Sequence, residues 1–417
     1  MVRSRGFAQR GGRSATLPVA IGFGLIASIL YGLGAGLRAD IGVLLGPMTE
    51  SSGLTYQDVS LCVAVLQLVF GASQPIFGIV ALRRSNRFVL LIGVGLLAAS
   101  LVTIPYAHSF IGLFLSLGVL LGVGCGALAF GVILGSVTRL VGPHRAMLVS
   151  GMLNASAGLG AFALSPVIQT LEASHGMAGA MLVLCIPVAL LIPLVFVVTS
   201  GDAPTNEISS ASQDGKREES SPSARALFKD ALSNRTYRLL IAGFTTCGFH
   251  MVIIETHLFS QFVSYDITPG VSAWVFSLYG IFTIAGALLS GYLSTRVRKD
   301  RLLGSYYGFR AVWVLAYIFL APKNVFTAIL FSAGLGLTGD ATVSPTAGLV
   351  NEHFTLSRAA ALIGFLFFCH QIGAFASAWL GGVLLNLTGT YTAVWVLDAA
   401  FCAFACVASL RIGKQTT

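Results

Sequence analysis

Residues 17–46 read LPVAIGFGLIASILYGLGAGLRADIGVLLG, and Arg38 and Asp40 are the only charged residues in this stretch. A helix needs about 20 predominantly apolar residues to cross a bilayer. Four arginines precede the stretch, as in a signal peptide. However, it is longer than the roughly 7–15 apolar residues of such a peptide and shows no small-residue cleavage site. We therefore expect a first membrane-spanning helix that is retained.

The composition of the whole chain agrees with this expectation. Of its 417 residues, 55% are hydrophobic and 10% are charged, and the mean hydropathy is +0.85. A soluble domain has about 25% charged residues, so this chain lacks the polar residues that would cover a soluble fold of its length. The composition excludes a cytoplasmic enzyme, a secreted disulfide scaffold and a disordered protein, and it suits a bilayer.

Apolar segments of spanning length recur along the chain. We predict an all-α membrane protein with twelve transmembrane helices, six in each half. The first six are expected at residues 17–46, 57–82, 88–106, 109–138, 146–170 and 176–199, and the second six at 237–262, 271–293, 301–320, 325–350, 359–385 and 391–411.

The distribution of basic residues predicts the orientation. With the N-terminus in the cytoplasm, 22 of the 25 Lys and Arg residues fall in the tails or in cytoplasmic gaps. The exceptions are Lys323 in an outer gap, Arg38 near the outer end of span one and Arg310 within span nine. Cytoplasmic loops of membrane proteins are enriched in Lys and Arg, so we expect both termini to be cytoplasmic. Because the charges lie in short gaps rather than on one face, we expect no nucleic-acid binding.

Residues 200–236 break the apolar pattern. From Gly201 to Arg225 the chain is rich in Ser, Glu, Asp, Lys and Pro, which is typical of a flexible linker. We therefore predict an N-terminal cytoplasmic tail at 1–16, a six-helix bundle at 17–199, a cytoplasmic linker at 200–236, a second six-helix bundle at 237–411 and a C-terminal tail at 412–417.

A repeated turn supports the division into halves. GIVALRRSNR at 78–87 follows the second span, and GYLSTRVRK at 291–299 follows the eighth. Both place a glycine near a helix end and a basic cluster in a short turn. Matching halves are typical of transporters built from repeats, although generic basic loops could give this pattern by chance. We expect these turns to contribute to a cytoplasmic gate through Gly78, Arg83, Arg87, Gly291 and Arg296.

The cysteines give no sign of a metal centre or a disulfide. All seven lie inside apolar segments and lack ligand spacing. We interpret them as small buried apolar side chains and expect neither a metal nor a cofactor. They are Cys62, Cys125, Cys185, Cys247, Cys369, Cys402 and Cys406.

The six-plus-six plan, the long central loop and the paired basic turns resemble the major facilitator superfamily. That family's turn between spans two and three follows roughly G-x-x-x-D-R-x-G-R-R. Gly78 and the basic residues fit, but Leu82 stands at the Asp position and Ser85 at the second Gly, and Thr295 replaces the Asp in the second half. The resemblance implies that spans 1, 4, 7 and 10 line a central cavity. The chain lacks the Asp that makes a salt bridge in the family.

A closer resemblance is to the bacterial monocarboxylate-transporter-like branch. The matching stretches are YGLGAGLR at 31–38 running into IGVLL at 41–45, CGFH at 247–250 with THL at 256–258, and HQIGAF at 370–375. The resemblance implies a transporter for a monocarboxylate. One departure matters, because animal members similar to this branch carry an Arg in span eight as the carboxylate partner, and Ala287 stands there in this chain.

Polar side chains within the spans are functional candidates, because a charge in hydrocarbon costs at least about 2.5–3.5 kcal/mol. Tyr31 and Arg38 are seven residues apart, close to two turns, and share a face of span one. The Arg38 guanidinium could hold a substrate carboxylate through two parallel hydrogen bonds. The alternative is an arginine that extends to the outer membrane surface.

Span seven carries His250, Glu255 and His257. The two histidines share a face, and Glu255 lies within a turn of His257. Since histidine exchanges protons near physiological pH, we expect both histidines at the substrate site and Glu255 in proton coupling. The alternative is neutral histidines that hydrogen-bond to neighbouring helices. A zinc site is disfavoured because no further ligand cluster appears.

Spans nine to twelve add further polar residues. We expect Asp340 in span ten either to bind and release the driving proton or to pair with a cation, of which Arg310 in span nine is the nearest in sequence. A structural role for Arg310 is the alternative. His370 and Gln371 in span eleven are candidate substrate ligands, and Asp398 is expected to be interfacial or structural.

Together these features predict a monomeric secondary transporter of a bacterial inner membrane. It would move a small organic solute, a monocarboxylate with a proton, by alternating access. The chain has neither a nucleophile elbow with a Ser-His-Asp set nor a G-x-x-x-x-G-K-[ST] loop, so neither an enzyme nor direct ATP use is expected. The alternative is a proton-driven exporter of apolar or cationic molecules, which Ala287, Glu255 and Asp340 favour. A membrane sensor would need a soluble output domain, and an intramembrane enzyme a catalytic set; the sequence shows neither.

Overall fold

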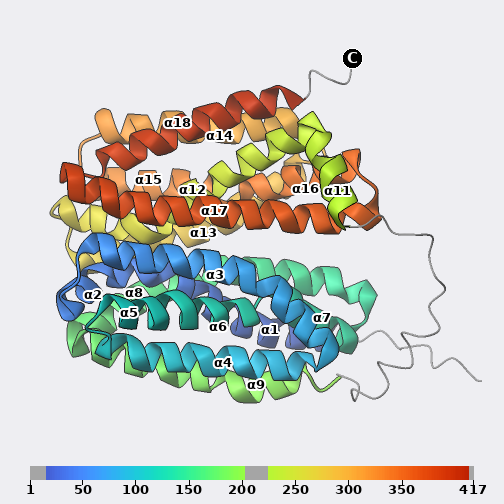
Figure 1. The fold of residues 1–417 in the computed structure, drawn as a ribbon, viewed down its shortest axis with the longest axis horizontal. Coiled ribbons are helices and arrows are strands. Elements are labelled where there is room, and N and C mark those ends of the chain that lie inside the picture. The colour runs from blue at the N-terminus through green and yellow to red at the C-terminus, as the bar shows by residue number, and fades with distance from the viewer. Residues whose placement is uncertain (1–15, 202–223, 413–417) are drawn as a thin grey trace, which may run out of the picture.

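The structure is a computed structural model that describes residues 16–201 and 224–412, and these residues form long helices that run side by side (Figure 1). No β-strand occurs in these two ranges. The predicted N-terminal tail, most of the predicted linker and most of the C-terminal tail lie outside the described residues.

Eleven helical segments of the described chain are long and apolar enough to cross a membrane. The longest, Pro143–Val198, changes direction at Gly176, whose φ of 67° is a left-handed conformation that glycine adopts without strain. The turn divides this segment into two spans. The all-α membrane fold is therefore confirmed, and each of the twelve predicted spans has a helical counterpart.

The N-half of the molecule, residues 17–198, contains the first six spans. Its elements are α1 (Leu17–Ala39), the 3-10 helix η1 (Asp40–Leu44), α2 (Leu45–Ser52), α3 (Tyr56–Arg83), α4 (Asn86–Thr103), η2 (Ile104–Tyr106), α5 (Phe110–Leu113), the π-helix η3 (Phe114–Leu121), α6 (Gly122–Ala127), α7 (Phe130–Val141), α8 (Pro143–Ala189) and α9 (Leu191–Val198).

The C-half, residues 224–410, contains a surface helix and the second six spans. Its elements are α11 (Ala224–Ser233), α12 (Arg235–Ser264), α13 (Pro269–Leu293), α14 (Lys299–Phe319), α15 (Val325–Thr338), the 3-10 helix η4 (Asp340–Thr342), α16 (Val343–His353), α17 (Leu356–Thr388) and α18 (Thr392–Leu410).

Short polar side chains fix where several spans begin. Thr55 accepts a hydrogen bond from the Asp58 backbone N–H, and the Asp58 carboxylate accepts one from the Thr55 N–H, which is a capping box at the start of α3. Asn234 caps α12 in a similar way by accepting from the Tyr237 N–H. These caps satisfy amide groups that would otherwise be left without partners.

The largest contacts between the two halves involve three helix pairs. Between the halves, α3 packs against α17, α8 against α13, and η1 against α12. Figure 1 shows α3 and α17 lying side by side at the boundary between the blue and the red halves. Where α8 crosses α13, a Cβ on Gly158 would lie 2.6 Å from the Gly280 oxygen, and a Cβ on Gly280 would lie 2.5 Å from the Gly158 oxygen. Only glycine permits backbones to approach this closely.

Three of the spans expected to line the centre are interrupted. Span one contains η1, span four contains the π-helix η3, and span ten contains η4. Irregular turns of this kind commonly occur at functional sites and leave backbone groups free for other partners. Span seven, in contrast, is the continuous helix α12.

The last part of the predicted linker is helical. α11 packs against α17, with the Phe228 and Phe365 ring centres 5.1 Å apart. Arg358 also donates to Asp230 at 3.0 Å. The region predicted as a linker at 200–236 therefore includes a helix attached to the C-half.

Candidate functional site

Arg38 joins the two halves. Its Nη1 donates to Gln67 Oε1 on α3 at 2.6 Å and to Glu255 Oε2 on α12 at 3.0 Å, and its Nη2 lies 3.5 Å from Glu255 Oε1. The guanidinium carbon lies 5.0 Å from the centre of the Phe70 ring. The Arg38 side chain is 16% exposed and that of Glu255 is 7% exposed. This geometry disfavours an arginine that extends to the membrane surface.

His257 makes a second link between the halves. Its Nδ1 lies 2.9 Å from the Tyr56 hydroxyl on α3, and its Nε2 lies 3.1 Å from the Ala378 oxygen on α17. Beside it, Asn386 donates to Gln57 at 3.3 Å. His257 therefore lies between the halves with a protein partner at each ring nitrogen, as in the alternative of a histidine that hydrogen-bonds to neighbouring helices, and its role as a substrate ligand stays a prediction.

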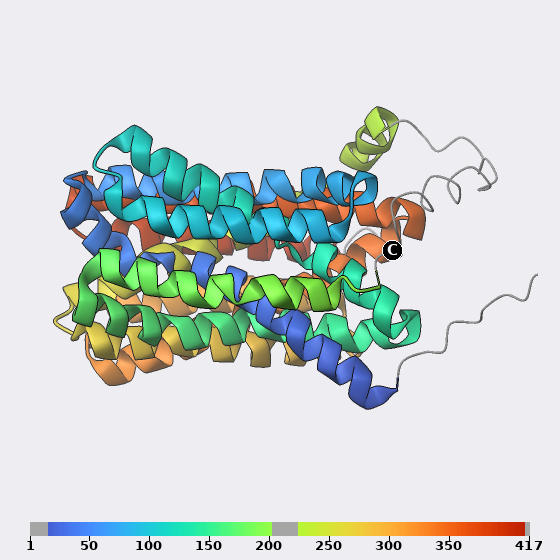
Figure 2. The ribbon, with the colours of Figure 1, turned by 90° about the horizontal axis from the view of Figure 1, so that it is seen from below.

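The hydrogen bonds between the halves gather at one end of the molecule. We call this end the closed end and define it by residues 37–45, Tyr56 and Gln57 with their contacts on α12 and α17. Apart from Arg38, residues 37–45 are all buried. At the opposite end α1 diverges from its neighbours (Figure 2).

Several polar atoms around Arg38 have no protein partner. Gln67 Nε2, the Tyr279 hydroxyl, His370 Nδ1 and Gln371 Oε1 are buried and make no hydrogen bond. They come from α3, α13 and α17, and thus from both halves. Since buried polar groups are normally hydrogen-bonded, these atoms offer donors and acceptors for a polar solute between the halves.

Asp340 belongs to the same cluster. It begins η4 at the interruption of span ten, is partly buried and, within the described residues, forms no ion pair. Glu255, His370, Arg310 and Arg38 lie close enough to act on it electrostatically. The cluster thus combines two carboxylates with a single arginine that bridges the halves.

Tyr31 lies on α1, seven residues before Arg38. It packs edge-on against Phe130, with the ring centres 5.8 Å apart and the planes at 73°. Both Arg38 and Asp340 are near enough to act on its hydroxyl. The structure therefore brings Tyr31 close to Arg38 and Asp340, and their roles at a substrate site remain predictions.

Gln371 lies at the contact between α17 and α3. A Cβ on Gly71 would lie 2.5 Å from Gln371 Cγ. The neighbouring His370 packs against Phe244, with the ring centres 5.1 Å apart. Gln371 therefore lies at the boundary between the halves, and Arg38 of the N-half lies close enough to act electrostatically on His370.

Arg310 does not pair with Asp340. It is fully buried, and its Nη2 donates to the backbone oxygens of Thr338 and of Gly339, the latter at 2.7 Å. The guanidinium carbon lies 5.3 Å from the centre of the Tyr307 ring. Because both oxygens lie at the interruption of span ten, Arg310 stabilises the interruption, which agrees with the structural alternative.

His250 lies inside the C-half. Its Nδ1 lies 2.7 Å from Asp398 Oδ2 on α18, and both side chains are fully buried. His250 and His257 therefore contact different neighbours despite their seven-residue spacing. The result agrees with a histidine that hydrogen-bonds to a neighbouring helix and with the structural role expected of Asp398.

Cys402 completes the set of possible metal ligands around His250. One ligand atom from each of His250, Asp398 and Cys402 lies within 4.8 Å of the others. The 2.7 Å separation of the histidine and aspartate atoms is that of a hydrogen bond. Two ligands of a tetrahedral zinc ion would lie about 3.3 Å apart. We therefore assign a hydrogen-bonded group and not a metal centre.

The basic turns make contacts within their own halves. Arg87 donates through Nε to the Thr199 hydroxyl at 3.0 Å, and the Arg296 guanidinium lies 5.4 Å from the Tyr292 ring centre. Arg298 donates to Asp300 at 2.9 Å, and this hydrogen bond raises the pKa of the exposed Arg298. Gly78 and Gly291 lie near the ends of α3 and α13, and Arg83 is exposed at the last residue of α3.

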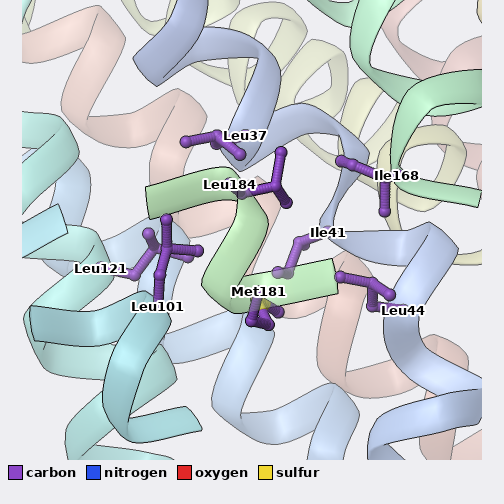
Figure 3. A pocket seen from close by; sticks show the side chains of 8 residues that line it. All are labelled: Leu37, Ile41, Leu44, Leu101, Leu121, Ile168, Met181 and Leu184. Carbon is purple, nitrogen blue, oxygen red and sulfur yellow. The ribbon is translucent and has the colours of Figure 1, made fainter. Parts of the chain in front are cut away.

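A small apolar pocket lies within the N-half (Figure 3). Its lining contains no polar side chain, so it does not suit a charged solute. The lining residues are Leu37, Ile41, Leu44, Leu101, Leu121, Ile168, Met181 and Leu184.

The sequence analysis does not select four polar residues of the cluster and of the closed end as site residues. They are Asp40, Tyr56, Gln67 and Tyr279. Asp40 follows Arg38 by two residues in an apolar segment, and that signal was sufficient to select it. The other three are neutral residues in apolar spans, and nothing in their local sequence separates them from residues that face lipid.

A family model described as Major Facilitator Superfamily matches residues 24–264 and 258–416. The chain is also 24% identical over 399 residues to an uncharacterized MFS-type transporter, YcxA, of Bacillus subtilis (strain 168), covering 93% of this chain and 94% of that protein. It is 27% identical over 362 residues to monocarboxylate transporter 12 of Rattus norvegicus, covering 80% and 72% of the two chains.

Solved structures share the fold. The nucleoside transporter NupG superposes with a TM-score of 0.74 at 15% identity, covering 94% of this chain and 99% of that one. A D-xylose-proton symporter gives a TM-score of 0.71 at 12% identity, covering 95% and 98%. A bacterial homolog to the human lysosomal transporter Spinster, in an inward-facing and unoccupied conformation, gives 0.72 at 15% identity, covering 96% and 98%.

Proposed function

The chain belongs to the major facilitator superfamily, and from this premise we propose that it moves a small organic anion, a monocarboxylate, together with a proton. The family and the relatives confirm the prediction of a multi-pass membrane transporter of small molecules rather than an enzyme. The two halves rock about a central site that opens to each side in turn.

The observation that carries this proposal is the Arg38–Glu255 ion pair. A guanidinium holds a carboxylate best through two parallel N–H donors. In the structure Glu255 faces both Nη atoms, at 3.0 and 3.5 Å. A substrate carboxylate therefore competes with Glu255 for Arg38.

Protonation of Glu255 resolves this competition. A neutral Glu255 no longer balances the charge of Arg38, and the guanidinium is then free for the carboxylate of the substrate. Proton and anion each favour binding of the other, which is the reciprocal coupling that a symporter needs. Arg38 thereby replaces the span-eight arginine whose position Ala287 occupies.

The surrounding residues divide into three groups. Tyr31, His370 and Gln371 supply hydrogen bonds to the substrate, together with Gln67. Asp340 shares the charge of the site with Glu255 and is the second candidate proton carrier. The sequence-based roles of Arg310 and His250 change, since both now support the C-half.

The membrane orientation follows from the basic residues. The tails and the turns with Gly78, Arg83, Arg87, Gly291 and Arg296 face the cytoplasm of a bacterium, in its inner membrane. In this orientation the closed end faces the outside, and the end where α1 diverges from its neighbours faces the cytoplasm. The turns act at the cytoplasmic rim when the halves rock, and a single chain is the functional unit.

Uptake into proteoliposomes tests the proposal. With a proton gradient directed into the vesicles, so that the outer solution is the more acidic, radiolabelled L-lactate or pyruvate is expected to accumulate above its external concentration. It is expected to leave after addition of a protonophore. Arg38→Gln is expected to abolish uptake, whereas Arg84→Gln, which removes an exposed arginine, serves as the matched control. Unchanged uptake in Arg38→Gln would contradict the proposal.

The second candidate is a proton-driven exporter of cationic or apolar molecules. It is supported by the two carboxylates, Glu255 and Asp340, beside an arginine that is already neutralised. In the same proteoliposomes, expulsion of a cationic dye without accumulation of any carboxylate would favour this candidate.

A further inference from the structure

Asp40 is a buried acid that the proposed roles do not use. It is the first residue of η1, it is fully buried, and neither carboxyl oxygen has a hydrogen-bond partner. The Ser165 backbone on α8 lies close enough to act on it but makes no hydrogen bond of normal geometry. Burying an ionised carboxylate without partners is very unfavourable. The environment therefore requires a neutral carboxylic acid.

The charges around Asp40 lead to the same conclusion. Among the elements packed against η1, α1 contributes Arg38 and α12 contributes Glu255. Arg38 already binds Glu255 at 3.0 Å. His257 on α12 is held by Tyr56 and Ala378, and Glu50 on α2 is exposed. Glu255 and Asp40 thus compete for Arg38. Glu255 forms the ion pair, and Asp40 has no basic partner among these residues.

The burial of Asp40 depends on closure of the halves. η1 lies directly against α12, where a Cβ on Gly42 would collide with the backbone oxygens of Glu255 and Thr256. Beside Asp40, the Ser165 hydroxyl donates to the Ala273 oxygen on α13 at 3.1 Å. Glu255 on α12 lies close enough to act on Asp40 electrostatically. Asp40 therefore lies at the boundary between the halves, and separating α12 and α13 from the N-half is expected to admit water to it. An aspartic acid in contact with water is ionised at neutral pH.

We propose that Asp40 is a proton-binding site that controls the closed end: the end seals only with a proton on Asp40, and it opens when this proton leaves to the outer water. The proposal rests on the alternating access of the proposed function but not on a carboxylate as the substrate. It assigns to Asp40 a gating proton that is separate from the proton on Glu255.

Closure then takes up one proton from the outer compartment. By linkage, the ratio of closed to open molecules falls by up to tenfold for each unit of rising outer pH. An acidic outer compartment therefore favours the state that faces the cytoplasm.

Spin labels across the closed end test this inference. Labels at Glu50→Cys and Leu387→Cys, two exposed positions in opposite halves, report the distance between the halves by double electron–electron resonance on the full-length protein in lipid nanodiscs. In the labelled protein that retains Asp40, the fraction of molecules with a long distance between the two labels is expected to grow as the pH rises from 5 to 8. In Asp40→Asn, which mimics the protonated acid, the short distance is expected to dominate at every pH.

Controls separate the possible explanations. Asp40→Glu retains a titratable acid and is expected to retain the pH dependence, and the protein without introduced cysteines gives the background signal. An unchanged pH dependence in Asp40→Asn would overturn the proposal. So would a shift driven by sodium at constant pH, because a metal ion would then occupy the site. Failure of carboxylate uptake together with intact pH-dependent closure would contradict the proposed substrate and leave the role of Asp40 standing.

Discussion

Two arginines within the membrane spans of this protein have different kinds of partner. Arg38 binds a carboxylate that belongs to the other half of the molecule, whereas Arg310 binds backbone oxygens within its own half. The first set of bonds must change when the halves separate, and the second need not. The comparison teaches that the half to which its partner belongs indicates whether a charged residue takes part in transport. How deeply the residue is buried indicates this less well.

Arg310 provides the most severe test of this comparison. In Arg310→Met the oxygens of Thr338 and Gly339 lose a charged donor in a buried position. Hydrogen bonds to charged groups contribute about 1.5–3 kcal/mol each, so we expect the variant to unfold at a clearly lower temperature in detergent. Arg84→Met is the matched control. An unchanged unfolding midpoint would show that Arg310 does not stabilise span ten.

Asp398→Asn is expected to have the next largest effect. It removes the charge from the hydrogen bond to His250, with a loss of about 2 kcal/mol in the free energy of unfolding. Proton-driven uptake per folded molecule is expected to persist, because both residues lie within the C-half. If the variant were as stable as the parent but no longer coupled uptake to the proton gradient, His250 and Asp398 would have to take part in transport.

Glu255→Gln is expected to give the opposite pattern. It frees Arg38 without exposing a new charge, so the unfolding temperature should change little. Accumulation driven by a pH gradient should disappear, while exchange of substrate between the two sides continues and no longer depends on pH. Retained accumulation would remove Glu255 from the path of the coupling proton.

Tyr56→Phe is expected to have the smallest effect. It removes two neutral hydrogen bonds of the Tyr56 hydroxyl at the closed end, one with His257 at 2.9 Å and one from the Tyr391 hydroxyl at 3.4 Å. The shorter bond contributes about 1 kcal/mol, so we expect at least a roughly fivefold shift from closed to open molecules. The spin-label distance between Glu50 and Leu387 positions measures this shift, and a variant as closed as the parent would show that this link does not hold the end shut.

Much of the fold is predictable because the bilayer imposes it. Twelve apolar segments, the repeated basic turns and the polar stretch in the middle locate the spans and the two halves. The interruptions of spans one, four and ten are less visible, because η1, η3 and η4 depend on contacts with other helices. Gly339 before Asp340 is compatible with an interruption but does not require one.

The pairings within the site could not be predicted. Arg38 and Glu255 are both identified as charged residues within spans, but they are 217 residues apart and belong to different halves. No periodicity relates residues across that separation. The seven-residue spacing of His250 and His257 suggests a shared environment, yet His250 contacts Asp398 on α18 whereas His257 contacts Tyr56 on α3.

The mutual approach of Gly158 and Gly280 has a mechanical consequence. The two glycine backbones touch there, with the Ile284 side chain packed beside Gly158, so the crossing of α8 and α13 can serve as a pivot between the two halves. Under the proposed rocking motion, the segments on either side of it swing in opposite directions while the contact itself persists. A methyl group added at Gly158 or Gly280 would force the two helices apart at this pivot. It would hinder the motion without altering any group that binds the substrate.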